Sequence, residues 1–177
     1  MNSQNLFKEF NEKPELWHTY HQIAEANEEL FGEENIPRNR IIRALNNEKT
    51  KRTKTVVDMG CGKAQIAQHF ATDKRFIFTN YDHISANELV TQCDISQTNL
   101  DEDSVEICIL CLAMWGSNCE QYVKEAHRIL ETNGKLYIIE PTKRWTKQDE
   151  NKNYIKGEEG KKLRSLLVNS GFKIIEE

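Results

Sequence analysis

The sequence contains no long run of apolar residues. Of its 177 residues, 38% are hydrophobic and 29% are charged, and no stretch approaches the roughly 18 apolar residues that cross a bilayer as a helix. Residues 1–10 have neither a basic start nor an apolar stretch, so they do not resemble a secretory signal. These absences predict an intracellular protein without a membrane segment.

The sequence also lacks the cysteine pattern of a disulfide framework or a metal site. Its five cysteines are an odd number, which favours free thiols in an intracellular protein. Cys108 and Cys111 form a Cys-x-x-Cys pair, but they lie in the apolar run Val105 to Leu112. A strand there would direct the two sulfurs to opposite faces, whereas a redox or metal pair needs a turn that brings them together. We therefore expect core packing and no bound metal.

An overall positive charge is absent as well. The formal net charge is −4, which excludes a general electrostatic attraction to nucleic acid. The distribution is nevertheless uneven: residues 36–54 contain seven basic residues and one acidic residue, and residues 143–164 contain eight basic and four acidic residues. Two readings of these segments remain open, contact with phosphates or solvated faces that keep the protein in solution.

A short stretch with two glycines, Val56 to Gly62, is the most informative part of the sequence. Two β-branched residues and Asp58 lead into Gly60 and Gly62, and apolar residues at helical spacing follow. The pattern predicts a strand, a tight turn and a helix. The third glycine of the dinucleotide fingerprint and the Gly-Lys-Ser/Thr ending of a phosphate loop are both missing, which disfavours pyrophosphate and triphosphate ligands. A nucleotide-like ligand resting on the turn and a purely structural turn both remain compatible.

Two helices are expected ahead of this stretch. Asn11 is a candidate cap for a helix over residues 14–30, on which Trp17, Tyr20 and His21 share one face. A histidine on an aromatic face is most often a packed core residue. Pro37 is expected to begin the second helix.

The rest of the chain alternates between strand and helix patterns. Further strands are expected at residues 76–81, 89–93, 105–112, 135–140 and 172–175, and helices at residues 119–130 and 158–170. This alternation predicts an α/β fold with a doubly wound, mostly parallel sheet. We expect residues 1–54 to form an N-terminal helical segment over the ligand site and residues 55–177 to form the core of a single domain.

Three acidic residues follow three of the predicted strands. Because ligands of parallel sheets bind beyond the carboxyl ends of the strands, we expect Asp58, Asp82 and Asp94 to lie at one edge. Asp82 comes twenty residues after Gly62, the usual distance for a carboxylate that accepts hydrogen bonds from ribose hydroxyls. The alternative for each is an Asx turn or a helix cap.

Taken together, these stretches resemble one family of class I S-adenosylmethionine-dependent methyltransferases, the Rrp8-like (ribosomal RNA-processing protein 8) methyltransferases. The Gly-x-Gly turn alone is common to many families, and the later loop Cys111 to Asn118 and the upstream Tyr-His pair are more specific. The resemblance rests on Tyr20-His21, Pro37 with Ile41 and Leu45, Asp58 to Gly62, Asp82, Cys93-Asp94-Ile95, Asp103-Ser104-Val105, Cys111 to Asn118, Glu125 to Leu130, and Gly171 to Ile174.

The resemblance implies a Rossmann-like fold, S-adenosylmethionine as the cofactor, and transfer of its methyl group to N1 of an adenine in ribosomal RNA. It implies a nuclear or nucleolar location, the alternative being the cytoplasm. It names no catalytic residue. The residues expected to bind the cofactor are His21, Asp58, Gly60, Gly62, Asp82, Asp94, Ile95 and Cys111. For the RNA we expect contacts from Trp115, Asn118, Arg40, Arg43, Lys143 and Arg144.

The chain departs from the family in ways that keep other functions open. The family would continue into a seventh strand, which is apparently missing here, so we expect an exposed sheet edge that invites a homodimer or another partner. The loop after the fourth strand lacks the motif that exocyclic amine methylation usually requires, which favours methylation of a ring nitrogen or other chemistry without a catalytic base. A small-molecule methyltransferase and a non-catalytic S-adenosylmethionine-binding module are the alternative functions.

Overall fold

The computed structural model describes residues 1–28 and 32–175. The chain divides into two compact units, Met1–Ile139 and Glu140–Glu177, which are described separately below. The N-terminal helices therefore belong to the same unit as the sheet. Within the described residues, no helix is both long enough and apolar enough to cross a membrane.

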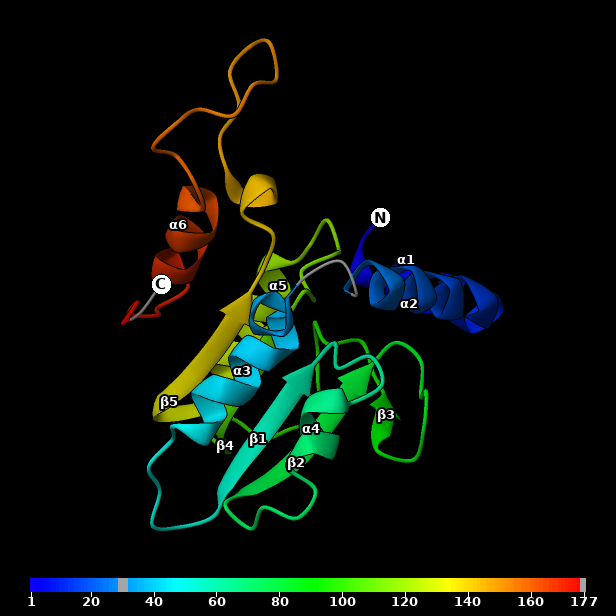
Figure 1. Ribbon diagram of the computed structural model, residues 1–177, viewed down its shortest axis with the longest axis vertical. Coiled ribbons are helices and arrows are strands. Elements are labelled where there is room, and N and C mark those ends of the chain that lie inside the picture. Colours follow the sequence, from blue (N-terminus) through cyan, green and yellow to red (C-terminus); the bar gives the residue numbers. More distant parts are fainter. Residues whose placement is uncertain (29–31, 176–177) are drawn as a thin grey trace. The chain divides into compact units, whose positions relative to one another are not determined.

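The first unit is built on a sheet of five parallel strands (Figure 1), and this arrangement confirms the predicted α/β class. The strand order is β3-β2-β1-β4-β5. Because all the strands run in one direction, their carboxyl ends lie at one edge of the sheet. The strands are β1 (Lys54–Met59), β2 (Phe76–Asp82), β3 (Val90–Gln92), β4 (Val105–Cys111) and β5 (Leu130–Ile139).

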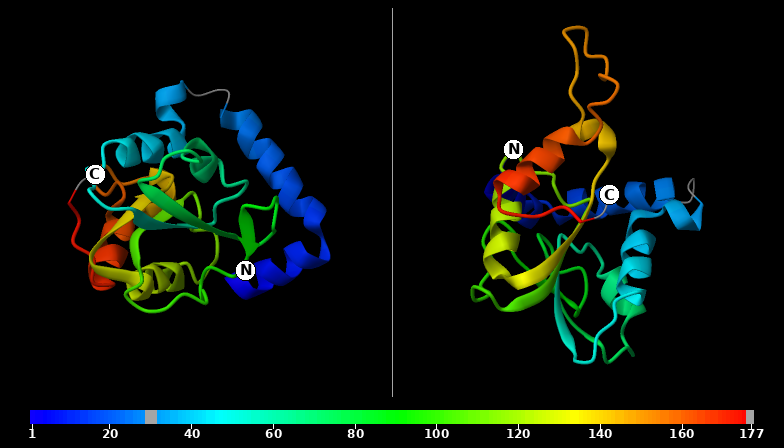
Figure 2. Two further views of the ribbon diagram at one scale, coloured as in Figure 1. Left: turned by 90° about the horizontal axis from the view of Figure 1, so that it is seen from below. Right: turned by 90° about the vertical axis from the view of Figure 1, so that its left-hand side faces the viewer.

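Helices cover both faces of this sheet (Figure 2, left). On one face lie α3 (Pro37–Asn46) and α4 (Gln65–His69), and on the other lies α5 (Glu120–Ile129). The core on the α3 side is formed by Ile41, Leu45, Val56, Ile66, Phe70, Phe76, Ile107 and Ile109. This two-sided cover explains why β4 is apolar on both faces. The strands predicted at residues 76–81, 89–93 and 105–112 and the helix at 119–130 agree with β2, β3, β4 and α5 to within a residue or two, whereas β5 begins five residues before the predicted strand at 135–140.

A buried carboxylate ties the end of α3 to the sheet. Glu48 is only 8% exposed and accepts hydrogen bonds from Lys54, Lys135 and Tyr137. Burial alone would raise the pKa of Glu48, but these three bonds lower it to about 2. Glu48 is therefore charged and paired at neutral pH, which fixes α3 against β1 and β5.

Two helices precede α3, and the first of them was not predicted. Asn2 caps α1 (Ser3–Glu12) by accepting a hydrogen bond from the Asn5 N–H. Asn11 lies inside this helix, so the prediction that it caps the next helix is wrong. The second helix, α2 (Pro14–Glu28), was predicted; the end expected at residue 30 lies outside the described residues. A short 3₁₀ helix, η1 (Glu33–Asn35), leads into α3.

The second unit contains a 3₁₀ turn, η2 (Thr142–Trp145), and one helix, α6 (Lys161–Asn169). The strand predicted at residues 172–175 is not formed. The backbone instead turns at Gly171, which has a positive φ of 94°, and the Phe172 N–H donates to the Leu167 carbonyl. This bond closes the end of α6, as a glycine after a helix commonly does.

Candidate functional site

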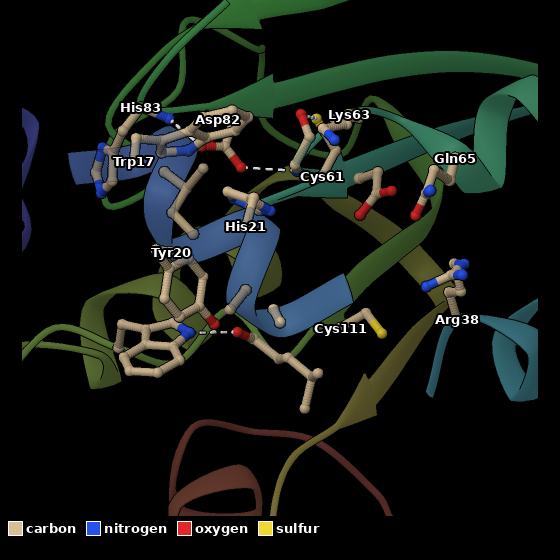
Figure 3. Close-up of a pocket in the computed structure, with 18 of the residues that line it drawn as sticks. Trp17, Tyr20, His21, Arg38, Cys61, Lys63, Gln65, Asp82, His83 and Cys111 are labelled. Atoms are coloured by element: carbon tan, nitrogen blue, oxygen red, sulfur yellow. Dashed lines mark hydrogen bonds between the residues drawn. The ribbon is translucent and has the colours of Figure 1, made fainter. Parts of the chain in front are cut away.

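A cavity of about 340 Å³ lies at the carboxyl ends of β1, β2 and β4 (Figure 3). Its wall on one side is the Gly-x-Gly turn after β1, and on the other side are residues of α1 and α2. The volume is within the range of small-molecule sites. Seven of the eight residues predicted to bind the cofactor line it: His21, Asp58, Gly60, Gly62, Asp82, Ile95 and Cys111.

The pairing of β1 with β2 brings the glycine turn to Asp82. Met59 is in register with Tyr81, and the N–H groups of Gly60 and Cys61 both donate to the Tyr81 carbonyl, at 2.8 and 3.0 Å. Gly60 has a φ of 81°, and a Cβ built on it would lie 2.7 Å from the Cβ of Ala113. A side chain at this position would collide with the loop after β4, so Gly60 is required for packing as well as for the turn.

The Asp82 carboxylate is the centre of the hydrogen bonding in the cavity. One oxygen accepts from the Gly62 N–H at 2.8 Å. The other accepts from the His83 N–H and from the indole N–H of Trp17, each at 2.8 Å. The predicted acceptor of ribose hydroxyls therefore faces the glycine turn, as expected. Trp17 was not predicted to reach it.

Asp58 lies beneath the turn, at the end of β1, and is 2% exposed. Burial, with a smaller contribution from the neighbouring charge of Asp82, raises the pKa of Asp58 to about 7. Two of the three predicted strand-end acids thus lie close together at this cavity. Near neutral pH, Asp58 is therefore charged in about half of the molecules, and burying that charge is costly. A carboxyl with so strongly raised a pKa is typical of functional sites.

The aromatic face of α2 covers the glycine turn. The ring of His21 lies 3.9 Å from that of Trp17, and its Cε1 would be 2.9 Å from a Cβ built on Gly62. His21 therefore fills the space that the second glycine leaves open. Burial lowers the pKa of the His21 imidazole, and the nearby carboxylates of Asp82 and Glu25 oppose this shift only in part.

Two ion pairs at the same cavity were missed at the level of sequence. Lys63 Nζ lies 2.8 Å from Glu25 Oε1, and Arg38 pairs with Glu28. All four residues line the cavity, and Figure 3 shows Lys63 beside Cys61 of the glycine turn and Arg38 apart from them. A signal was present, because His21, Glu25 and Glu28 are spaced to share one face of α2.

The rim of the cavity is aromatic. Trp115 is 56% exposed, its indole N–H donates to the Leu112 carbonyl at 2.6 Å, and its ring meets Tyr20 edge to face at 4.9 Å. His83 lines the cavity as well, and its buried Nδ1 has no hydrogen-bond partner among the described residues. The structure thus places the predicted substrate residue Trp115 at the opening of the predicted cofactor cavity.

Asp94 and Asn118 are engaged by the N-terminus and do not line the cavity. Asp94 accepts hydrogen bonds from the Ser3 hydroxyl and the Ser96 N–H, each at 3.0 Å. Asn118 accepts from the Ser3 N–H at 2.7 Å and donates to the Ser3 hydroxyl at 2.9 Å. Ser3 is fully buried between them. Their assignments to adenine and to substrate stay predictions.

The four basic residues predicted to contact phosphate lie outside the cavity lining. Arg40 is exposed on α3, and Arg43, also exposed there, donates to the Glu34 carbonyl at 2.5 Å. Lys143 and Arg144 belong to the second unit, where Arg144 lies over the ring of Trp145. No cluster of three potential metal ligands occurs among the residues that the structure describes.

Comparison with solved structures identifies the fold. The chain superposes with a TM-score of 0.60 on a 1,6-didemethyltoxoflavin-N1-methyltransferase from Burkholderia thailandensis, at 16% identity, over 91% of this chain and 78% of that one. It superposes with a TM-score of 0.59 on the [4+2]-cyclase SpnF, at 16% identity, over 77% and 57%. At this identity the likeness establishes the fold alone: the Rossmann-like fold of class I methyltransferases.

Sequence comparison then gives the family. A family described as "Hypothetical methyltransferase" matches residues 1–172. A 25S rRNA (adenine(645)-N(1))-methyltransferase from Schizosaccharomyces pombe is 31% identical over 81% of this chain, and ribosomal RNA-processing protein 8 from Arabidopsis thaliana is 35% identical over 77%. The chain belongs to this family of Rrp8-like methyltransferases. It covers 46% and 45% of those two relatives, less than half of their length.

Proposed function

We propose that the chain binds S-adenosylmethionine in the cavity under α2 and methylates RNA, at N1 of an adenine in ribosomal RNA. The observation that carries the proposal is the Asp82 carboxylate facing the Gly62 N–H at the carboxyl edge of the sheet. A relative matched over most of this chain is named as an rRNA adenine-N1 methyltransferase, which supports the choice of substrate.

The lining of the cavity fits a nucleoside with a charged amino-acid tail. Asp82 offers carboxylate oxygens to ribose hydroxyls, and Ile95 and Ala113 are buried apolar neighbours of the glycine turn suited to an adenine ring. Two ion pairs offer charges of both signs: the cations Lys63 and Arg38 suit a carboxylate, and their partners Glu25 and Glu28 suit an ammonium group. The bound cofactor supplies an activated methyl group on a sulfonium.

The residues of the chain contribute orientation and exclusion of water to this transfer. An in-line displacement needs the acceptor nitrogen aligned with the methyl group, and the ring nitrogen of adenine already carries a lone pair. No general base is therefore assigned. Cys111 lines the cavity at the end of β4, and α2 covers the glycine turn from the other side, so together they shield the reacting centre.

The opening of the cavity suits a base that leaves its stack. Trp115 and Tyr20 form an aromatic rim, and stacking of a base on such a side chain contributes about 1–3 kcal/mol. We assign phosphate contacts to Arg40, Arg43, Lys143 and Arg144. A substrate in ribosomal RNA also implies a nuclear or nucleolar site of action.

Labelled S-adenosylmethionine offered with total RNA, and separately with a metabolite extract, tests the proposal. We expect label in RNA, at N1-methyladenine after digestion. Label only in a metabolite would favour the small-molecule alternative, and binding without transfer would favour a non-catalytic module. In calorimetry, Asp82→Asn should weaken cofactor binding at least tenfold, whereas the exposed-turn control Asp101→Asn should bind like the wild type.

A salt titration tests the phosphate contacts separately. The logarithm of RNA affinity should fall linearly with the logarithm of salt concentration, by about 0.7 per neutralised phosphate for a single strand. A variant with glutamate at all four assigned basic positions should lose RNA binding and keep cofactor binding. Reversal of Lys124 on α5 is the control for charge alone, and RNA binding that ignores salt would contradict these assignments.

A further inference from the structure

Trp17 is the residue that seats α2 on the cavity. It is 2% exposed and is the single buried residue of α2 (Pro14–Glu28). The two ion pairs of this helix, from Glu25 and Glu28, involve partly exposed side chains, and such pairs contribute little in water. The burial of this indole and its hydrogen bond to Asp82 therefore contribute more to the position of α2 than the ion pairs do.

That hydrogen bond uses an acceptor position that a ribose would need. An ionised carboxylate has about four lone-pair positions. In Asp82, the backbone N–H groups of Gly62 and His83 occupy two of them, and the Trp17 indole occupies a third. The two backbone donors are fixed by the turn and the strand. They leave two positions, and a pair of ribose hydroxyls would need both, so it competes with the indole for one of them.

We propose that Trp17 is an internal competitor of the cofactor ribose, and that its indole must release Asp82 before the cofactor is fully bound. The inference rests on the proposed function, because it takes the ligand to be S-adenosylmethionine or its demethylated product. Figure 3 shows the arrangement, with Trp17 and His21 reaching the cavity from the same helix. The rings of Trp17 and His21 are in contact, so release of the indole also changes how His21 packs over Gly62.

The competition has a defined effect on affinity. A ligand that binds only when Asp82 is released has its affinity reduced by the fraction of molecules in that state. A substitution that removes the hydrogen bond from Trp17 to Asp82 should therefore tighten cofactor binding. Loss of a residue that contacts the cofactor would weaken cofactor binding. The sign of the change separates a competitor from a binding residue.

The test is Trp17→Phe, which keeps an aromatic ring in the site and removes the N–H donor. We expect S-adenosylhomocysteine to bind about tenfold more tightly to this variant than to the wild type in calorimetry, because a hydrogen bond to a charged group no longer opposes it. The matched control is Trp145→Phe, the same exchange at a residue outside the cavity lining, which should bind like the wild type.

A fluorescence measurement reports on Trp17 directly and does not depend on that variant folding. The chain has three tryptophans, so Trp115→Phe combined with Trp145→Phe leaves Trp17 as the only one. Its emission should shift to longer wavelength as S-adenosylhomocysteine is added, because the indole leaves a buried position.

The outcomes distinguish this inference from the proposed function. Equal or weaker binding by Trp17→Phe, or an emission maximum that stays fixed at saturation, would overturn the competition while cofactor binding by the wild type stands. If neither the wild type nor Trp17→Phe binds S-adenosylhomocysteine or S-adenosylmethionine, the proposed function itself fails, and the inference fails with it.

Discussion

Replacement of Asp58 by Asn should stabilise the protein at alkaline pH. The carboxyl is 2% exposed, and its pKa rises from an ordinary value of 3.8 to about 7. A raised carboxyl pKa means that the folded state disfavours the charged form. The stability associated with Asp58 is therefore greatest below pH 3.8 and is lost as the pH rises towards 7. Above pH 7 the penalty is constant.

The magnitude follows from the same pKa difference. One pKa unit corresponds to about 1.4 kcal/mol, so the rise from 3.8 to about 7 sets an upper limit of roughly 4 kcal/mol on the penalty. An Asn at this position would still bury a polar amide, which offsets part of the gain. We therefore expect Asp58→Asn to gain about 2–4 kcal/mol in free energy of unfolding at pH 8.

Denaturant unfolding of both proteins at pH 4.5 and pH 8 measures this gain. The difference between variant and wild type should be large at pH 8 and should shrink to less than about 1 kcal/mol at pH 4.5. Asp101→Asn, in an exposed turn, should show no difference at either pH. A gain of the same size at both pH values would mean that packing, and not ionisation, sets the cost of Asp58. No gain at pH 8 would refute the conclusion that the charged form of Asp58 destabilises the folded state.

Three further predictions concern stability and binding. Glu48→Gln should lower the free energy of unfolding by about 1–3 kcal/mol at pH 7. Denaturant curves should show this loss fading as the pH falls from 4.5 towards 2, because the charged Glu48 stabilises the fold and becomes protonated in that range. Gly60→Ala should lower the free energy of unfolding by about 2–4 kcal/mol in the same assay, because its Cβ would meet Ala113. The control Gly157→Ala, also at positive φ but with nothing within 4 Å, should lower it by only about 1 kcal/mol. His21→Ala should weaken cofactor binding in calorimetry by roughly tenfold; unchanged affinity with a lower melting temperature would make His21 a packing residue.

The sheet could be predicted because its signals are local. β-branched runs, glycines and acids at the strand ends placed β1 and β2, and the parallel order then brought Asp58 and Asp82 to one edge. The prediction of a strand at residues 172–175 was wrong for a local reason too, because a glycine such as Gly171 can close a helix as readily as it can precede a strand. The chemistry around Gly62 was therefore accessible from sequence.

The contacts of the N-terminal helices were not accessible in this way. Helical spacing put Trp17 and His21 on one face of α2, but it says nothing about which partner that face meets. The bond from Trp17 to Asp82 joins residues 65 positions apart. The same holds for Asp94, whose strand-end position is correct but whose carboxylate is engaged by Ser3 of α1, a helix that the sequence pattern did not reveal.

The burial of Ser3 has a practical consequence for work with this protein. Ser3 joins the loops that hold Asp94 and Asn118, the Ser117 N–H donates to the Met1 carbonyl, and Met1 itself lines the cavity. A substitution at Ser3 would therefore disturb two loops at once and reach the wall of the cavity, although Ser3 itself does not line it. Binding constants measured with such a variant would describe the displaced loops as much as the cavity.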